Sequence, residues 1–168
     1  MADTGAGRLK ALDTFLPSYE FIARYGVAVD AEAGEADRAL RAVTFREVPV
    51  VRALLFLRGL GSAAGEGSVL AAMRRRGTVL DDVPGEGVVL EIRGRFWRLR
   101  GGGGEPEATA VVDFRAVDGA LTTETRVRVP DGASRRRFAR YWRIVGPFSG
   151  VTRKHVLRAA KRRAERPA

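Results

Sequence analysis

The side chains best suited to covalent chemistry in this 168-residue chain are few and poorly placed for catalysis. The only histidine, His155, follows Lys154 and has no carboxylate one helical turn away, so we expect a solvated helix residue. Asp81 and Asp82 are neighbours in a predicted strand and point to opposite faces, which is unsuitable for a cation site. Without cysteine there is no thiolate nucleophile, disulfide or cysteine metal ligand. The sequence therefore predicts no catalytic residue, no metal and no cofactor.

Two glycine-containing segments resemble functional motifs only superficially. The glycines within 59–67 follow a predicted helix, whereas a dinucleotide-binding loop follows a strand and opens a helix. Segment 146–150, Gly-Pro-Phe-Ser-Gly, lacks the spacing of a nucleophile elbow. Because proline removes a helical hydrogen bond, Gly146-Pro147 predicts a kink or break that lets the chain from Val151 onward leave the body.

The net charge of +10 is confined to the C-terminal segment 131–168, which holds twelve Lys or Arg and two acids, while the preceding residues are balanced. The same segment has helical apolar periodicity, which predicts an amphipathic helix with an arginine-rich outer face. The residues of its predicted inner stripe are Phe138, Tyr141, Trp142, Val145, Phe148, Thr152, Val156, Ala159 and Ala160.

The elements before this helix follow from periodicity and turn signals. Strands are expected over 19–29, 78–83, 87–92, 95–99, 109–117 and 120–129, and helices over 32–43, 48–60 and 68–76. The second of these helices is apolar on nearly every side, which predicts burial on more than one face.

Asp118-Gly119 is a strong hairpin signal and fixes a register. The expected pairs are Ala116 with Leu121, Phe114 with Thr123, Val112 with Thr125, and Ala110 with Val127, on one apolar face. The opposite face carries Asp113, Arg115, Glu124 and Arg126, expected to be exposed pairs of little energetic weight. The fold class predicted is α+β, with helices on one face of an antiparallel sheet.

This order of elements resembles the helix-grip fold of the START-like (SRPBCC) superfamily, in which a curved sheet wraps around a long C-terminal helix. Four stretches are similar to a bacterial branch common in actinobacteria: FLPSY at 15–19, GRFWR at 94–98, TETRV at 123–127 and SRRRFARYWR at 134–143. The resemblance implies a domain over 15–164, with a basic helix end at 151–164. It leaves 1–14 as an N-terminal extension and 165–168 as a tail.

Proteins of this superfamily bind lipids, sterols, polyketides or plant hormones, and a minority are cyclases or hydratases. The resemblance implies a cavity of a few hundred cubic ångströms between sheet and helix. Tyr141, Trp142, Thr123 and Thr125 are the expected polar handles for a ligand. The full set of ligand-lining residues expected is Val51, Leu54, Leu55, Phe114, Thr123, Thr125, Phe138, Tyr141, Trp142 and Val145.

The favoured function is binding or carriage of a hydrophobic small molecule by a cytoplasmic monomer or weak dimer. The alternatives are a cyclase- or dehydratase-like enzyme in the same cavity, and nucleic-acid binding through the basic helix, which no helix-turn-helix pattern supports. A further hypothesis is peripheral contact with an anionic membrane through the cations after Gly150. These cations are Arg153, Lys154, Arg158, Lys161, Arg162, Arg163 and Arg166. The start of the chain lacks the apolar region of a signal peptide, and no apolar run is long enough to span a bilayer.

Overall fold

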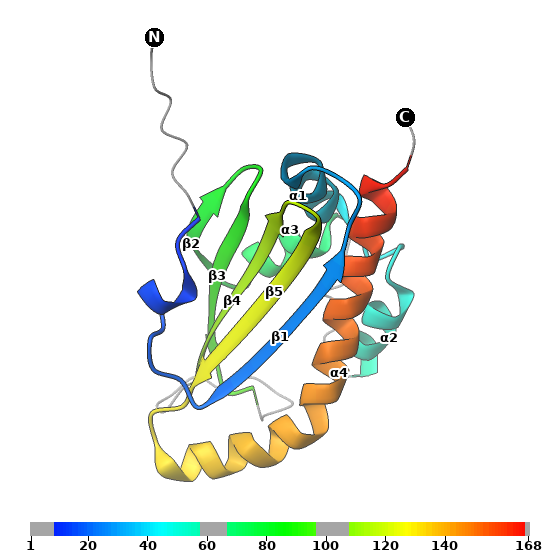
Figure 1. The fold of residues 1–168 in the computed structure, drawn as a ribbon. Coiled ribbons are helices and arrows are strands. Elements are labelled where there is room, and N and C mark those ends of the chain that lie inside the picture. Colours follow the sequence, from blue (N-terminus) through cyan, green and yellow to red (C-terminus); the bar gives the residue numbers. More distant parts are fainter. Residues whose placement is uncertain (1–8, 58–66, 97–107, 167–168) are drawn as a thin grey trace.

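The centre of the fold is a five-stranded antiparallel sheet of order β1-β5-β4-β3-β2 (Figure 1). The structure is a computed structural model, and it describes residues 9–57, 67–96 and 108–166. The strands are β1 (Phe21–Ala28), β2 (Thr78–Val83), β3 (Gly87–Gly94), β4 (Ala108–Val117) and β5 (Ala120–Arg128). The strand expected over 95–99 does not form at Arg95 and Phe96, and 97–99 lie outside the described residues.

The β4–β5 hairpin has the predicted turn and register. Gly119 has a φ of 77°, a conformation that glycine adopts without steric cost. Ala116 pairs with Leu121, Val112 with Thr125 and Ala110 with Val127, as expected. The backbone ladder is interrupted where Phe114 and Thr123 were expected to pair. There Asp113 accepts hydrogen bonds from Thr123 Oγ1 at its carbonyl (2.6 Å) and from the Glu124 N–H at its carboxylate (2.7 Å).

Three helices lie between β1 and β2: α1 (Ala33–Ala42), α2 (Pro49–Leu57) and α3 (Val69–Arg74). Buried Asp37 of α1 accepts hydrogen bonds from Arg41 Nε (2.7 Å) and from the Gly85 N–H (2.8 Å), which ties α1 to the β2–β3 turn. The expectation that α2 is buried on more than one face is wrong, because Val50 is 40% and Phe56 74% exposed.

The C-terminal helix α4 (Gly132–Ala164) is continuous through Pro147. Asp131 caps it by accepting hydrogen bonds from the backbone N–H groups of Ser134 (2.6 Å) and Ala133 (3.3 Å). The helix bends, so that its first part runs beneath one end of the sheet and its second part rises along the sheet (Figure 1). The chain after Val151 therefore does not leave the body, contrary to expectation. Its apolar residues Val156, Leu157, Ala159 and Ala160 are buried in the core.

We call the face covered by α1, α3 and α4 the inner face of the sheet, and the opposite one the outer face. Residues 9–16, which include the 3₁₀ helix η1 (Leu12–Thr14), cover part of the outer face. Leu9, Leu12 and Leu16 pack there with Val89 and Val111 in one hydrophobic cluster. Residues 9–14, which the sequence indicated to be part of an N-terminal extension over 1–14, thus pack against the sheet.

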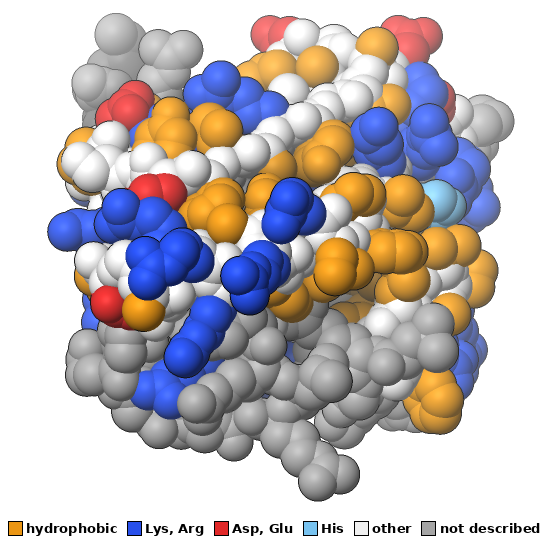
Figure 2. Space-filling model, turned by 90° about the horizontal axis from the view of Figure 1, so that it is seen from below, with side chains coloured by type: hydrophobic (Ala, Val, Ile, Leu, Met, Phe, Trp, Pro, Cys, Tyr) orange, Lys and Arg blue, Asp and Glu red, His pale blue; other side chains and the backbone are white. Residues whose placement is uncertain are grey.

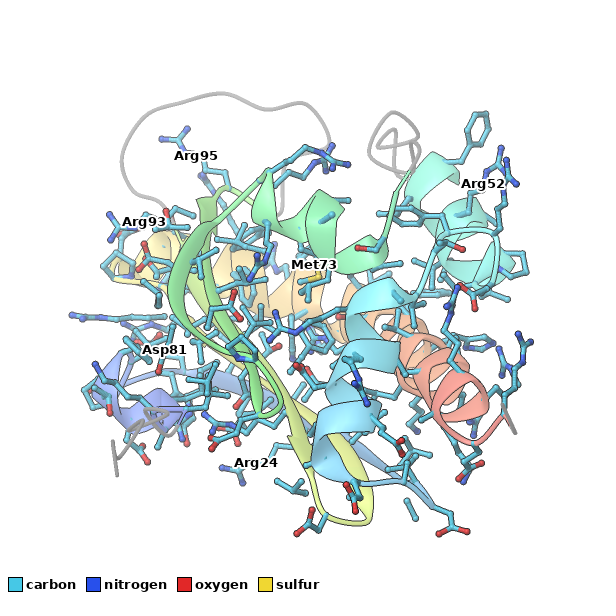
Figure 3. All side chains as sticks on the ribbon, turned by 90° about the horizontal axis from the view of Figure 1, so that it is seen from above. Arg24, Arg52, Met73, Asp81, Arg93 and Arg95 are labelled. Carbon is cyan, nitrogen blue, oxygen red and sulfur yellow. The ribbon has the colours of Figure 1, made fainter. Side chains whose placement is uncertain are left out.

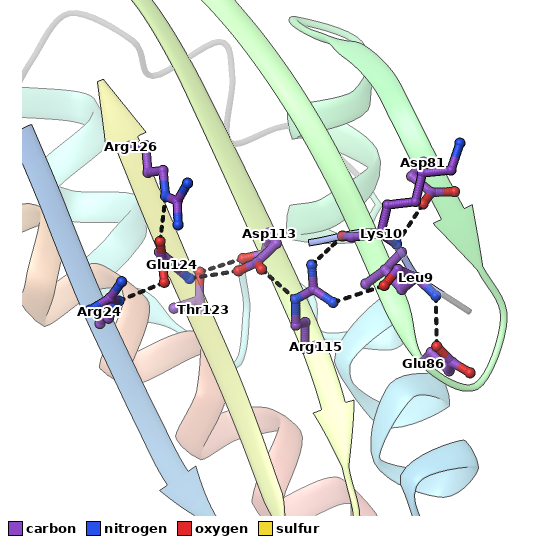
Figure 4. A network of polar contacts seen from close by, with 10 residues as sticks. All are labelled: Leu9, Lys10, Arg24, Asp81, Glu86, Asp113, Arg115, Thr123, Glu124 and Arg126. Carbon is purple, nitrogen blue, oxygen red and sulfur yellow. Dashed lines mark hydrogen bonds and ion pairs between the residues drawn. The ribbon is translucent and has the colours of Figure 1, made fainter. Parts of the chain in front are cut away.

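A polar network crosses the outer face beneath this segment (Figure 4). Glu124 accepts hydrogen bonds from Arg24 and Arg126 (both 2.6 Å), and Asp113 accepts one from Arg115 (2.5 Å). The expectation of exposed pairs is wrong for Asp113 and Arg126, which are 4% and 5% exposed because residues 9–16 lie over them. Burial raises the pKa of Asp113, although the hydrogen bond from Arg115 opposes the shift.

Candidate ligand site between the sheet and the C-terminal helix

A small cavity lies between the sheet and the helices. Its volume is about 10 Å³, and it is lined by Leu40, Val69, Leu70, Met73, Phe114 and Val156. Figure 3 shows Met73 in the interior of the molecule, whereas Arg24 and Arg52 lie at its periphery. This volume has room for about one water molecule. Of the residues expected to line a ligand cavity, only Phe114 borders it.

The expected lining residues fall into two separate clusters. Val51, Leu55 and Phe114 belong to the main core, which α1, α2, α3 and the second part of α4 form with the sheet. Phe138, Tyr141 and Trp142 belong to an aromatic cluster under the first part of α4. Leu54 and Val145 are half-buried. The described residues therefore do not bring the expected set around one space.

The aromatic cluster has the geometry of packed core. Phe138 is 1% exposed, and its ring centroid lies 4.6 Å from that of Phe21 and 5.6 Å from that of Trp142, with which it stacks. Such contacts are typical of aromatic pairs in protein interiors. Tyr141 and Trp142 are half-buried at the edge of this cluster.

Three hydroxyl-bearing side chains lie on the inner face of β1 and β5. Tyr25 is the cross-strand neighbour of Thr123, and Thr125 lies two residues further along β5 on the same face. Thr123 donates its hydroxyl to the Asp113 carbonyl, as described above. Thr125 Oγ1 is buried and has no hydrogen-bond partner among the described residues. A buried hydroxyl without a partner is uncommon in folded proteins.

Arg153 is half-buried on α4, which differs from the expectation drawn from the sequence. It was assigned to the outer cationic surface of α4, but its Nη1 atom is fully buried and has no hydrogen-bond partner in the described part of the chain. Burial lowers the pKa of the guanidinium to about 10, and weaker attraction to Tyr25 and Asp113 opposes the shift. The carboxylate of Asp113 is already engaged by Arg115 and Glu124. Arg153 is therefore a half-buried cation with one fully buried guanidinium nitrogen, and it remains charged at neutral pH.

The approach of α4 to β1 explains why Arg153 is buried. Gly150, one helical turn before Arg153, is buried against the Tyr25 hydroxyl, and any side chain at position 150 would collide with that ring. Positions 146, 150, 153 and 157 share one helical face, which is the signal that could have placed Arg153 inside. The predicted stripe instead used Phe148, which is 52% exposed.

Two of the other cations after Gly150 have acidic partners. Arg163 Nε donates a hydrogen bond to Glu47 (2.7 Å). This hydrogen bond, together with those that Glu47 accepts from Thr44, lowers the pKa of Glu47 to about 2. Lys161 donates to Glu165 (2.5 Å) and to the Ala28 carbonyl (2.9 Å). Lys154 lies 5.4 Å from the centroid of the Tyr25 ring and is exposed, as are Arg158, Arg162 and Arg166.

His155 lies half-buried on α4, with Nδ1 2.9 Å from the Val151 carbonyl. Within the described ranges, no cluster of His, Asp or Glu could hold a metal ion, and no helix has the length and apolar character needed to cross a bilayer. Comparisons of the chain with protein-family models, with curated proteins and with solved structures found no match.

Proposed function

We propose that this protein binds and carries a hydrophobic small molecule with an anionic group, held between the inner face of the sheet and α4. The proposal includes a small version of the START-like helix-grip architecture and a cytoplasmic location. One observation carries it: the Nη1 atom of half-buried Arg153, on the inner side of α4, is fully buried and has no hydrogen-bond partner among the described residues.

A buried charge without a partner is costly, and proteins normally compensate it with an acid or with several hydrogen bonds. Arg153 forms no ion pair with any described residue. A carboxylate or phosphate on a ligand would accept a charge-assisted hydrogen bond from the free N–H group of Arg153. The unpartnered Thr125 hydroxyl and the Tyr25 hydroxyl on the same face would add neutral donors. These groups favour an anionic ligand.

The surroundings of this polar group favour a ligand that is otherwise apolar. The main core next to Arg153 is formed by Val156, Leu157 and Phe114 with other aliphatic side chains. A lipid-sized ligand needs several hundred cubic ångströms, so about 10 Å³ is far too little. Binding therefore requires part of the helical layer to move away from the sheet. Pro147 has no N–H for the helical hydrogen-bond ladder, which makes the bend of α4 the natural place for such a shift.

Native mass spectrometry of the protein purified from its own host tests this function. The wild type should carry one non-covalent adduct of lipid-like mass that contains a carboxylate or phosphate. Arg153→Met should lose the adduct, and Arg158→Met, which removes an exposed cation one turn along the same helix, should retain it. A wild type that carries no adduct and takes up no added dodecanoate would overturn the proposal, as would an adduct retained by Arg153→Met.

A further inference from the structure

The outer side of α4 has an apolar centre between two cationic ends. Residues 137, 140, 144, 148, 151, 158 and 162 share one helical face, since they recur at steps of three, four and seven. In order they are Arg137, Arg140, Ile144, Phe148, Val151, Arg158 and Arg162, a set that we call the outer stripe. At about 1.5 Å per residue, the apolar centre is about 10 Å long.

The apolar centre of the outer stripe is exposed. Ile144 is 67%, Phe148 52% and Val151 40% exposed, and all three lie at or next to the bend of α4. Figure 2 shows hydrophobic side chains gathered here between two groups of Lys and Arg, with the only histidine beside one group. A contiguous exposed apolar patch of this kind is characteristic of an interaction site.

The cations at both ends of the outer stripe are free to interact. Arg137, Arg140, Arg158 and Arg162 are exposed, and none forms an ion pair with an acid in the described ranges. A helix with apolar residues at its centre and arginines around them matches the interface of an anionic bilayer. The apolar side chains enter the acyl boundary, and the guanidinium groups stay among the phosphates.

We propose that the outer stripe is a docking surface for anionic lipid bilayers. It differs from the surface expected from the sequence, because the Nη1 atom of Arg153 is buried and Lys161 and Arg163 are engaged by Glu165 and Glu47. Docking here uses the bend itself, and Gly146-Pro147 thus serves to present Ile144 and Phe148 outward. The proposal does not depend on the ligand site at Arg153.

Charge distribution argues against the two other occupants of such a face. Antiparallel pairing with a second copy about Phe148 would bring Arg140 of one chain next to Arg158 of the other, which is repulsive. A nucleic-acid backbone would neutralise the arginines but would leave Ile144 and Phe148 without an apolar partner. Of these three occupants, the bilayer is the one that satisfies both components of the outer stripe.

Co-sedimentation with vesicles tests the surface. The wild type should sediment with phosphatidylcholine vesicles that contain phosphatidylglycerol, and much less with phosphatidylcholine alone or at high salt. Replacing both Ile144 and Phe148 by Ser should weaken the binding at least about tenfold, since it removes most of the exposed apolar centre. Arg137→Ser and Arg140→Ser should each weaken it about fivefold, the equivalent of ~1 kcal/mol per charge.

The matched controls keep the result interpretable. Val117→Ser changes a residue of similar exposure (46%) at the β4–β5 turn and should bind as the wild type does. Arg153→Met should also bind normally, which separates this surface from the ligand site. Thermal melts verify that every variant folds. Equal sedimentation with neutral vesicles, full binding by the Ile144 and Phe148 double variant, or RNA binding that depends on the same arginines without vesicle binding would each overturn the proposal.

Discussion

Replacing Arg153 by methionine should stabilise the protein while it removes the preference for an anionic ligand. Burial lowers the pKa of this guanidinium from its ordinary value to about 10, and each pKa unit corresponds to about 1.4 kcal/mol. The charged form therefore destabilises the folded chain by about 3 kcal/mol at neutral pH. Because the folded-state pKa is depressed for a base, this cost is complete below pH 10 and fades as the pH rises further, toward the pKa of the unfolded chain.

Methionine has a similar length and no charge. Its imperfect fit offsets up to about 1.5 kcal/mol of the stability gained by removing the charge. The expected net gain is thus about 2 kcal/mol in the free energy of unfolding, or a rise of roughly 5 °C in Tm for a chain of this size. Guanidinium-chloride titration and thermal melts of wild type and variant measure it. Arg158→Met, at an exposed position, should change the stability by less than about 0.5 kcal/mol.

A loss of stability in Arg153→Met of 1 kcal/mol or more would refute the reasoning, because it would mean that the folded chain itself satisfies this guanidinium. A gain of stability together with a loss of the preference for an anionic ligand is the pattern expected of a residue kept for function at the expense of stability.

Three further predictions concern the elements that hold α4 and the sheet together. Glu47→Gln should lower the free energy of unfolding by about 1 kcal/mol, a figure discounted for the partial exposure of Glu47. Because the pKa of Glu47 is lowered to about 2, the difference in urea stability between wild type and variant should shrink as the pH falls from about 5 to about 2. A difference that does not depend on pH would contradict this prediction. Leu12→Ala should destabilise by about 2–3 kcal/mol in denaturant titrations, whereas a change near zero would show that residues 9–16 do not pack on the sheet. Gly150→Ala should destabilise the protein by about 1–2 kcal/mol, because the added methyl group would collide with Tyr25. Gly146→Ala should be neutral or stabilising, because a methyl group at that position meets nothing closer than 3.5 Å. Equal melting temperatures of the two variants would refute the close approach of α4 to Tyr25.

The fold was largely predictable because its signals are local. Alternation along β1, the Asp118-Gly119 turn and the helical period of the last segment each depend on a few neighbouring residues. They predicted the element order and three of the four pairs in the β4–β5 register. The cover that residues 9–16 provide for Asp113 was not predictable, since it depends on contacts about a hundred residues apart.

The candidate site was harder to predict than the fold, because the side-chain types in α4 suggest the wrong residues for its inner and outer faces. Phe148 looked like core and Arg153 like surface, yet Phe148 is 52% exposed and the Nη1 atom of Arg153 is fully buried. Gly150 offered no apolar signal, although its lack of a side chain is what lets α4 lie against Tyr25.

Calorimetric titration with dodecanoate and dodecanol, on wild type and Arg153→Met, tests the central claim most directly. The two probes share an apolar chain and differ in the anionic group that Arg153 is proposed to bind. A charge-assisted hydrogen bond contributes about 1.5–3 kcal/mol, so the wild type should bind one dodecanoate per chain at least about tenfold more tightly than dodecanol. Arg153→Met should bind the two equally. Equal affinities in the wild type, or a preference for dodecanoate that survives in Arg153→Met, would contradict the account.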